Sequence, residues 1–219
     1  MGDLEKLYAH RFPAASQARR EAIWQVLCTR FFQRYVVETD TVLDIACGRG
    51  EFIRNIRAAQ KIGVDINAEN ASRLDTRIEF HAIDAIDLSP IDSSSVDVCF
   101  SSNFFEHLPS KDTLDRVLRE AYRVLKPGGR FVSMHPNLRH APGKYWDYYD
   151  HVLPLTDRSC AEAFAKAGFE LVEVIGRFLP FSTRSALPQS PWLVRLYLSC
   201  RPVWRVVGGQ FLIVARKPF

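Results

Sequence analysis

Short apolar runs alternate along this chain with segments in which apolar residues recur every three or four positions. The runs predict buried strands over residues 41–46, 61–65, 78–81, 96–101, 130–134, 170–177 and 210–215. The periodic segments predict helices over residues 16–36, 51–59, 113–125 and 157–167. Strands that alternate with helices indicate a Rossmann-like, doubly wound α/β sheet, preceded here by an N-terminal helical cap over residues 1–40.

Two stretches interrupt this pattern. Residues 135–156 show little periodicity, and residues 178–209 separate the last two predicted strands. Within the second stretch, Pro191 predicts the start of a short helix. Connections of this length in a compact domain are often functional, so both stretches are candidates for a substrate lid.

The first strand breaks into the sequence Ala46-Cys47-Gly48-Arg49-Gly50, and a predicted helix follows. The N–H groups at a helix N-terminus favour an anionic part of a ligand, and glycine lets the backbone approach that ligand closely. A dinucleotide fingerprint, G-x-G-x-x-G/A, would put Ile53 at its third position, where a small residue is needed. This disfavours a nicotinamide-dependent oxidoreductase, which stays an alternative.

Charge and cysteine content narrow the class of protein further. The net charge of +4 hides an asymmetry, because no Asp or Glu follows Glu173 and the basic residues there interleave with aromatic ones. Five scattered cysteines without a C-x-x-C pair suit a reducing cytoplasm better than a disulfide framework or a zinc knuckle. Neither a signal peptide, a membrane span nor a nucleic-acid-binding motif is expected.

The pattern D-x-x-C-G-x-G, from Asp44 to Gly50, resembles motif I of the class I S-adenosylmethionine (SAM) dependent methyltransferases. The turn from Leu125 to Gly129 is also frequent in that family. The resemblance implies one domain over residues 1–219, with a seven-stranded sheet whose last strand is antiparallel. It also implies SAM as cofactor and S-adenosylhomocysteine as product. Ala46 departs from the family, which usually has glycine at that position.

The resemblance also implies which residues hold the cofactor. Asp65, at the end of the second strand, is expected on the ribose hydroxyls, with Ile66 beside it, and Asp84 with the Ala85 N–H on the adenine. The remaining residues expected at the cofactor are Asp44, Ala46, Cys47, Gly48, Gly50, Ser102 and Asn103. Tyr8, Arg11 and Phe12 are candidates for an N-terminal lid over it, with simple surface packing as the alternative.

Methyl transfer to a hydroxyl needs alignment, exclusion of water and removal of a proton. His135 after the fifth strand is the preferred base, and His107 and Glu106 after the fourth strand are the other candidates. We expect a small-molecule or glycan-type acceptor, methylated at oxygen, and no metal. Methylation at nitrogen or carbon, and a non-catalytic SAM-binding or membrane-surface module, stay as alternatives.

The acceptor is expected against the two unpatterned stretches. Tyr145, Trp146 and Tyr149 offer flat apolar walls with polar tips, although a helical turn that uses them as core is an alternative. Arg195 offers a contact for an anionic acceptor. The apolar and basic segment 178–209 fits a lid, a peripheral membrane contact or a homodimer surface.

Overall fold

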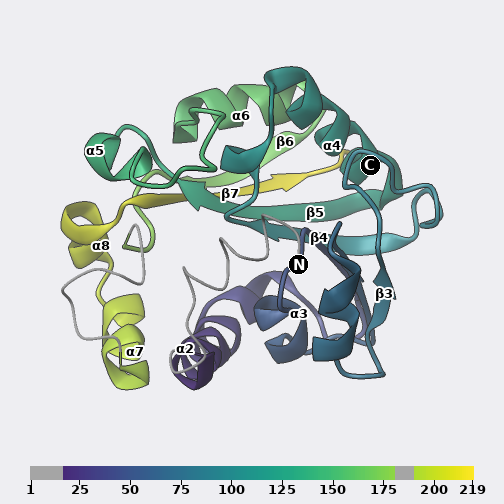
Figure 1. Cartoon of the computed structure of the whole chain (residues 1–219), viewed down its shortest axis with the longest axis horizontal. Coiled ribbons are helices and arrows are strands. Elements are labelled where there is room, and N and C mark those ends of the chain that lie inside the picture. The colour runs from purple at the N-terminus through teal and green to yellow at the C-terminus, as the bar shows by residue number, and fades with distance from the viewer. Residues whose placement is uncertain (1–16, 181–189) are drawn as a thin grey trace.

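A computed structural model describes residues 17–180 and 190–219 of the chain. The predicted lid residues Tyr8, Arg11 and Phe12 lie outside the described residues. The described part is built around one seven-stranded sheet with the order β3-β2-β1-β4-β5-β7-β6 (Figure 1). The strands are β1 Thr41–Ile45, β2 Gln60–Val64, β3 Glu79–His81, β4 Val96–Ser102, β5 Leu125–Pro136, β6 Glu170–Ile175 and β7 Gln210–Arg216.

The first five strands run parallel, and β7 pairs antiparallel with both β5 and β6. The predicted doubly wound sheet with an antiparallel last strand is therefore confirmed. Strand order reverses between β1 and β4, which lie side by side although β2 and β3 separate them in the sequence. In such sheets ligands bind beyond the carboxyl ends of the strands at this point.

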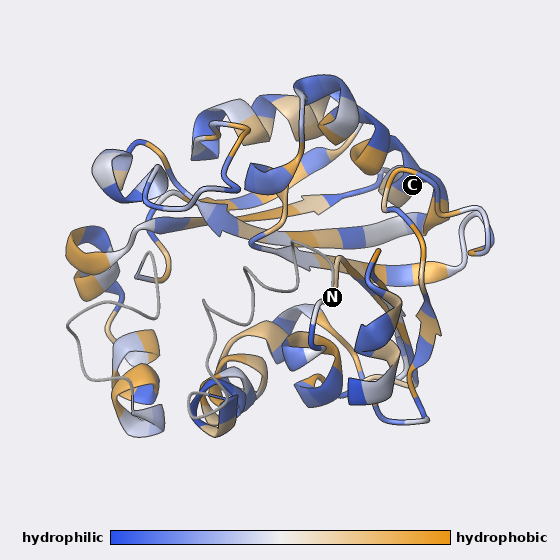
Figure 2. Cartoon of the chain, viewed as in Figure 1, coloured by the Kyte–Doolittle hydropathy of each residue, from blue (hydrophilic) through white to orange (hydrophobic). Residues whose placement is uncertain are grey.

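Helices cover both faces of the sheet, and each face has its own apolar core. One core packs α4 (Lys111–Val124) and α6 (Asp157–Lys166) against the sheet. The other core packs α2 (Gln17–Arg30), α3 (Glu51–Asn55) and α8 (Arg201–Val207) against the opposite face. Figure 2 shows apolar residues along the strands and polar residues on the outer turns of the helices.

Short elements complete the chain between these helices and strands. They are the 3₁₀ turns η2 (Phe32–Tyr35), η3 (Ala68–Arg73) and η4 (Phe105–His107), with helices α5 (Pro142–Tyr145) and α7 (Pro191–Ser199). Pro191 does start a helix, capped by the Ser190 hydroxyl, which accepts a hydrogen bond from the Leu193 N–H. Among the described residues, no helix has the length and apolarity to cross a membrane.

The structure corrects several predicted boundaries. The helix predicted over 16–36 stops at Arg30 and continues as η2, and the one predicted over 51–59 stops at Asn55. The predicted turn at 126–129 instead belongs to β5, which begins at Leu125 and carries a register shift opposite β4. There the Gly128 N–H donates to the Lys217 carbonyl, so β7 holds the distorted stretch within the sheet.

Candidate active site at the carboxyl ends of β1, β2 and β4

The loop after β1 takes left-handed backbone conformations at three positions. Ala46, Gly48 and Gly50 have φ angles of 58°, 54° and 76°. A side chain on Gly48 would meet nothing within 4 Å, whereas one on Gly50 would collide with Leu74. Gly48 therefore faces open space on the ligand side, while Gly50 is required for packing. Because Ala46 is not glycine, its φ angle costs free energy.

Asp65 follows β2 directly and ties that strand end to the glycine loop. One carboxylate oxygen accepts the Gly48 N–H at 2.8 Å, and the other accepts the Asn67 N–H at 2.9 Å and the Asn70 side-chain amide at 3.1 Å. A carboxylate has about four acceptor positions, so one position is still left for a ribose hydroxyl. Ile66 beside it is 72% exposed, which offers a flat apolar surface to a base ring.

Asp44 and Cys47 lie behind the loop rather than in front of it, with 3% and 7% of their surfaces exposed. Burial, together with the nearby charges of Glu51 and Asp65, raises the pKa of Asp44 well above its usual value. Burial also raises the pKa of the Cys47 thiol, which therefore stays protonated and is no nucleophile. Direct contact of these two side chains with a cofactor stays a prediction.

The segment after β3 places Asp84 and Ala85 on opposite sides of a turn. The Asp84 carboxylate is exposed and accepts the Ile86 N–H at 3.1 Å, whereas Ala85 is buried in the core. An exposed carboxylate next to backbone N–H groups suits the polar edge of a base. The structure therefore leaves Asp84, and the backbone of Ala85, available for their predicted roles.

The segment after β4 lies beside the glycine loop because β4 pairs with β1. The buried Ser101 hydroxyl donates to the Ile45 carbonyl at 3.1 Å and joins the two strand ends. Ser102 is half-buried, and Asn103 has a φ angle of 50°. The Gln210 side-chain amide donates to the Asn103 side-chain oxygen at 3.2 Å. Asn103, a predicted cofactor residue directly after β4, thus also contacts β7, a contact that the sequence did not suggest.

His135, the preferred base, is fully buried. Its ring stacks on Phe105 with centroids 3.9 Å apart, and its Nδ1 lies 3.3 Å from a Glu106 carboxylate oxygen. Burial is the main reason that the pKa of His135 is lowered, so the imidazole is neutral. A side chain without exposed surface does not meet an acceptor, so this geometry argues against His135 as the base.

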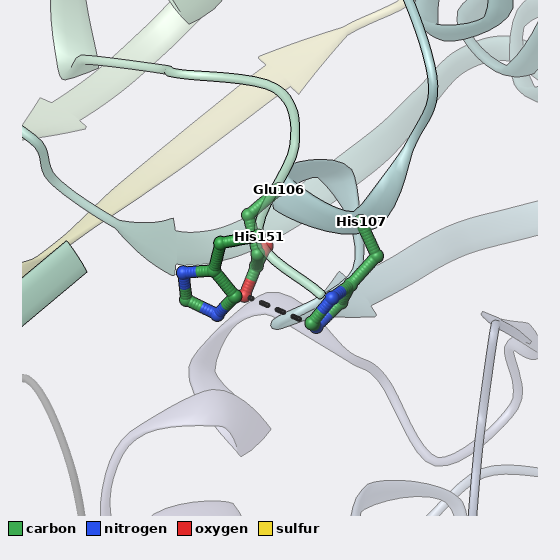
Figure 3. Close-up of side chains that lie close together, drawn as sticks. All are labelled: Glu106, His107 and His151. Carbon is green, nitrogen blue, oxygen red and sulfur yellow. Dashed lines mark ion pairs between the residues drawn. The ribbon is translucent and has the colours of Figure 1, made fainter. Parts of the chain in front are cut away.

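Three side chains gather where the segment after β4 meets the loop before α6: Glu106, His107 and His151 (Figure 3). The Val152 and Leu153 N–H groups donate to the Glu106 carbonyl at 2.8 and 3.0 Å and hold the two segments together. Glu106 is 1% exposed, whereas the His107 side chain keeps 20% of its surface exposed. Among the predicted bases, His107 is therefore the one that solvent reaches.

His151 was missed as a site residue because the sequence separates it widely from Glu106. Its ring lies edge-on to His107 with centroids 5.0 Å apart and stacks on Tyr148 at 4.8 Å. Burial lowers the pKa of His151. One signal in the sequence could have identified it: the run Tyr148-Tyr149-Asp150-His151. These polar and aromatic residues follow neither helix nor strand periodicity, which favours a functional role.

The predicted acceptor residues divide by exposure. Tyr145 is fully buried and donates its hydroxyl to the Leu153 carbonyl, so it belongs to the core and its predicted acceptor contact is not supported. Trp146 and Tyr149 are 54% and 95% exposed and remain candidates. Arg195 lies exposed on α7. One of these three aromatic residues, Tyr145, therefore serves as core, as the alternative interpretation held for part of the set.

Comparison with known proteins identifies this arrangement. Residues 43–133 match a family model described as a methyltransferase domain. The chain is 33% identical over 105 residues to a 27-O-demethylrifamycin SV methyltransferase of Amycolatopsis mediterranei, covering 42% of this chain and 37% of that protein. It is 28% identical over 172 residues to a demethylmenaquinone methyltransferase of Symbiobacterium thermophilum, covering 68% and 65%.

Comparison with solved structures also finds methyltransferases. A SAM-dependent methyltransferase from Archaeoglobus fulgidus superposes with a TM-score of 0.70 at 23% identity, over 98% of this chain and 100% of that one. The chain spans between 37% and 65% of the two curated relatives described above. The glycine loop, the acidic residue after β2 and the switch point between β1 and β4 fit the cofactor of that family, SAM. Residues 43–133 thus match a methyltransferase domain, and the chain has the fold of the SAM-dependent methyltransferases.

Proposed function

We propose that this chain transfers a methyl group from SAM to a hydroxyl of a small-molecule or glycan-type acceptor and releases S-adenosylhomocysteine. The observation that carries the proposal is the Asp65 carboxylate, which joins the end of β2 to Gly48 next to open space. Asp65 and Ile66 would hold the adenosine, with Asp84 and the Ala85 N–H at the base. Gly48, Ser102 and Asn103 would line the methionine part.

SAM supplies an already activated methyl group, so the protein aligns the acceptor, excludes water and receives a proton. We assign the handling of this proton to the exposed edge of the Glu106–His107 cluster. Oxygen as the target is supported by these acid–base groups and by the similarity to the 27-O-demethylrifamycin SV methyltransferase, whose name places the methyl group at an oxygen. Transfer to nitrogen or carbon is the alternative.

The acceptor would lie against Trp146 and Tyr149, which are exposed beside the cluster's loop. Exposed aromatic rings bind sugar or polyketide faces through apolar contact. Arg195 would meet an anionic group of the acceptor, such as a phosphate or carboxylate. Nucleic acid is not part of this proposal.

The outer faces of α7 and α8 form a second proposed contact, here called the α7–α8 surface. It is lined by the exposed apolar residues Trp192, Leu196, Val203 and Val206 and by the exposed basic residues Arg195, Arg201 and Arg205. Apolar and basic side chains without acidic ones are typical of peripheral contact with an anionic membrane. A homodimer contact is the alternative occupant of the same surface.

We place this activity in the cytoplasm and in one domain that includes the cap before residue 41 and both unpatterned stretches. The free thiols Cys28, Cys47, Cys99 and Cys160 are buried, in keeping with a reducing compartment.

The proposal is tested by incubating the full chain with SAM carrying a deuterated methyl group and a panel of hydroxylated acceptors. Mass spectrometry should find the labelled methyl group on an acceptor oxygen, together with S-adenosylhomocysteine. Calorimetry should find SAM binding independently of any acceptor. A chain that binds no SAM would overturn the proposal.

A further inference from the structure

The buried carboxylate of Glu106 is surrounded by imidazoles. His135 Nδ1 lies 3.3 Å from one carboxylate oxygen, and His107 Nε2 lies 3.9 Å from the other. No Lys or Arg within residues 17–180 and 190–219 forms an ion pair with Glu106. Buried charges are otherwise paired or coordinate metals, because desolvation of an isolated carboxylate is costly. The site therefore calls for a positive charge from another source.

A hydrogen bond to the backbone determines the tautomer of His107 and thereby which ring nitrogen carries a lone pair. Nδ1 lies 2.9 Å from the Asp150 carbonyl oxygen, with an Asp150 carboxylate oxygen at 3.3 Å. A carbonyl only accepts, so Nδ1 carries the proton. Nε2 of the neutral ring then points a lone pair toward the carboxylate, an arrangement that repels unless a cation stands between them. Such an outer hydrogen bond is also how metal-binding histidines are oriented.

The distances suit a cation better than a direct hydrogen bond. The 3.9 Å between His107 Nε2 and Glu106 Oε1 is too long for a hydrogen bond. A zinc ion binds nitrogen and oxygen at about 2.1 Å, so two of its ligand atoms stand between roughly 3.4 and 4.2 Å apart. His151 supplies a third ligand atom, and all three lie within 4.8 Å of one another.

We infer that Glu106, His107 and His151 bind a divalent transition-metal ion, with the open coordination position on the exposed side of His107. Two imidazoles and one carboxylate with an open position are a donor set that zinc and iron(II) take in enzymes. The ion neutralises the Glu106 charge.

The ion would also affect the proposed methyl transfer. This consequence rests on the proposed function, whereas metal binding does not. An acceptor hydroxyl bound to the ion at the open position would have a lowered pKa, so its proton would be removed more readily at this cluster. Metal binding itself does not depend on methyl transfer. It can therefore be measured without an acceptor and without SAM.

The test titrates zinc(II) and cobalt(II) into the full chain after removal of metals by chelation. Calorimetry should find one zinc ion per chain, and cobalt(II) should give the visible absorption of a four- or five-coordinate site with nitrogen and oxygen ligands. His107→Ala and His151→Ala should each weaken zinc binding by more than the roughly 10–100-fold that loss of an outer hydrogen-bond partner costs. His140→Ala, in the same loop but outside the cluster, should leave binding unchanged.

Two results would overturn the inference. One is the absence of stoichiometric zinc and cobalt(II) binding by the unmodified chain. The other is zinc binding that both His107→Ala and His151→Ala leave unchanged. The cobalt spectrum of the unmodified chain keeps the test valid if a variant fails to fold. A chain that binds zinc but methylates nothing would overturn the proposed function and leave the metal site standing.

Discussion

The carboxylate of Asp65 accepts the N–H of Gly48 at 2.8 Å, so the end of β2 positions the loop that follows β1. We expect Asp65→Ala to weaken SAM binding by about 10–100-fold, because hydrogen bonds to a charged group contribute about 1.5–3 kcal/mol. Calorimetry with SAM measures this. Asp87→Ala, an exposed carboxylate further along the chain, is the matched control. Equal affinity for the two variants would remove Asp65 from the cofactor site.

We expect His107 to contribute to catalysis and His135 to contribute to stability. His107→Gln should lower kcat by at least about 10²-fold, the loss typical of an acid–base group, while SAM affinity stays unchanged. His135→Leu should instead lower the melting temperature, because the imidazole ring that it removes is packed against Phe105. Steady-state kinetics with the acceptor found by the screen, beside thermal melts, gives both readouts. A fully active His107→Gln variant would contradict the assignment.

Ala46→Gly should stabilise the protein. Ala46 has a φ angle of 58°, a left-handed conformation that costs an alanine roughly 1–2 kcal/mol. Glycine's larger unfolded-state entropy offsets about 0.4–1 kcal/mol of that gain. Chemical denaturation should therefore show a net stabilisation. Ala161→Gly in α6 is the matched control and should destabilise by about 1 kcal/mol. A loss of stability in Ala46→Gly would show that its methyl group contributes packing.

Asp44 makes stability depend on pH. Burial raises its pKa in the folded state above the unfolded value. The contribution of such a group is fully present below the unfolded pKa and is lost as pH rises through the folded pKa. Asp44→Asn should therefore melt above the unmodified chain at pH 8, and the difference should shrink toward pH 5. Asp92→Asn, an exposed residue, should show no such trend. A variant that melts lower at every pH would contradict this account.

The α7–α8 surface should bind anionic vesicles in preference to neutral ones. Each basic side chain near an anionic surface contributes about 1 kcal/mol. In flotation with phosphatidylglycerol vesicles, Arg195→Glu/Arg201→Glu and Trp192→Ser/Leu196→Ser should each reduce bound protein. Val172→Ser, on the exposed face of β6, is the control for loss of surface apolarity. If all variants float alike, the surface binds something else, and sedimentation analysis would then test self-association.

The sequence predicted the sheet well because strand and helix periods are local properties. It also predicted the turn from Ala46 to Gly50 after β1 and the position of Asp65 after β2. Glycine and acidic residues at strand ends can be recognised in a short stretch of sequence. The sequence did not predict that His135 is buried, because the segments that cover this side chain, around Phe105 and Phe211, are far apart in the sequence. His151 was missed for the same reason. Tyr145 is buried and Tyr149 is exposed because of the way an irregular loop folds back on the protein. Hydrophobic periodicity in the sequence does not predict this.

The position of β7 between β5 and β6 has a consequence for synthesis on the ribosome. Within the part of the chain that the structure describes, β6 pairs with β7 alone, yet β7 is translated after the whole of α7 and α8. Until then β6 lacks its β7 partner, and its Leu171, Val172 and Val174 are exposed even in the folded chain. The nascent chain thus passes through a stage in which this edge is open to aggregation, and chaperone contact is expected there.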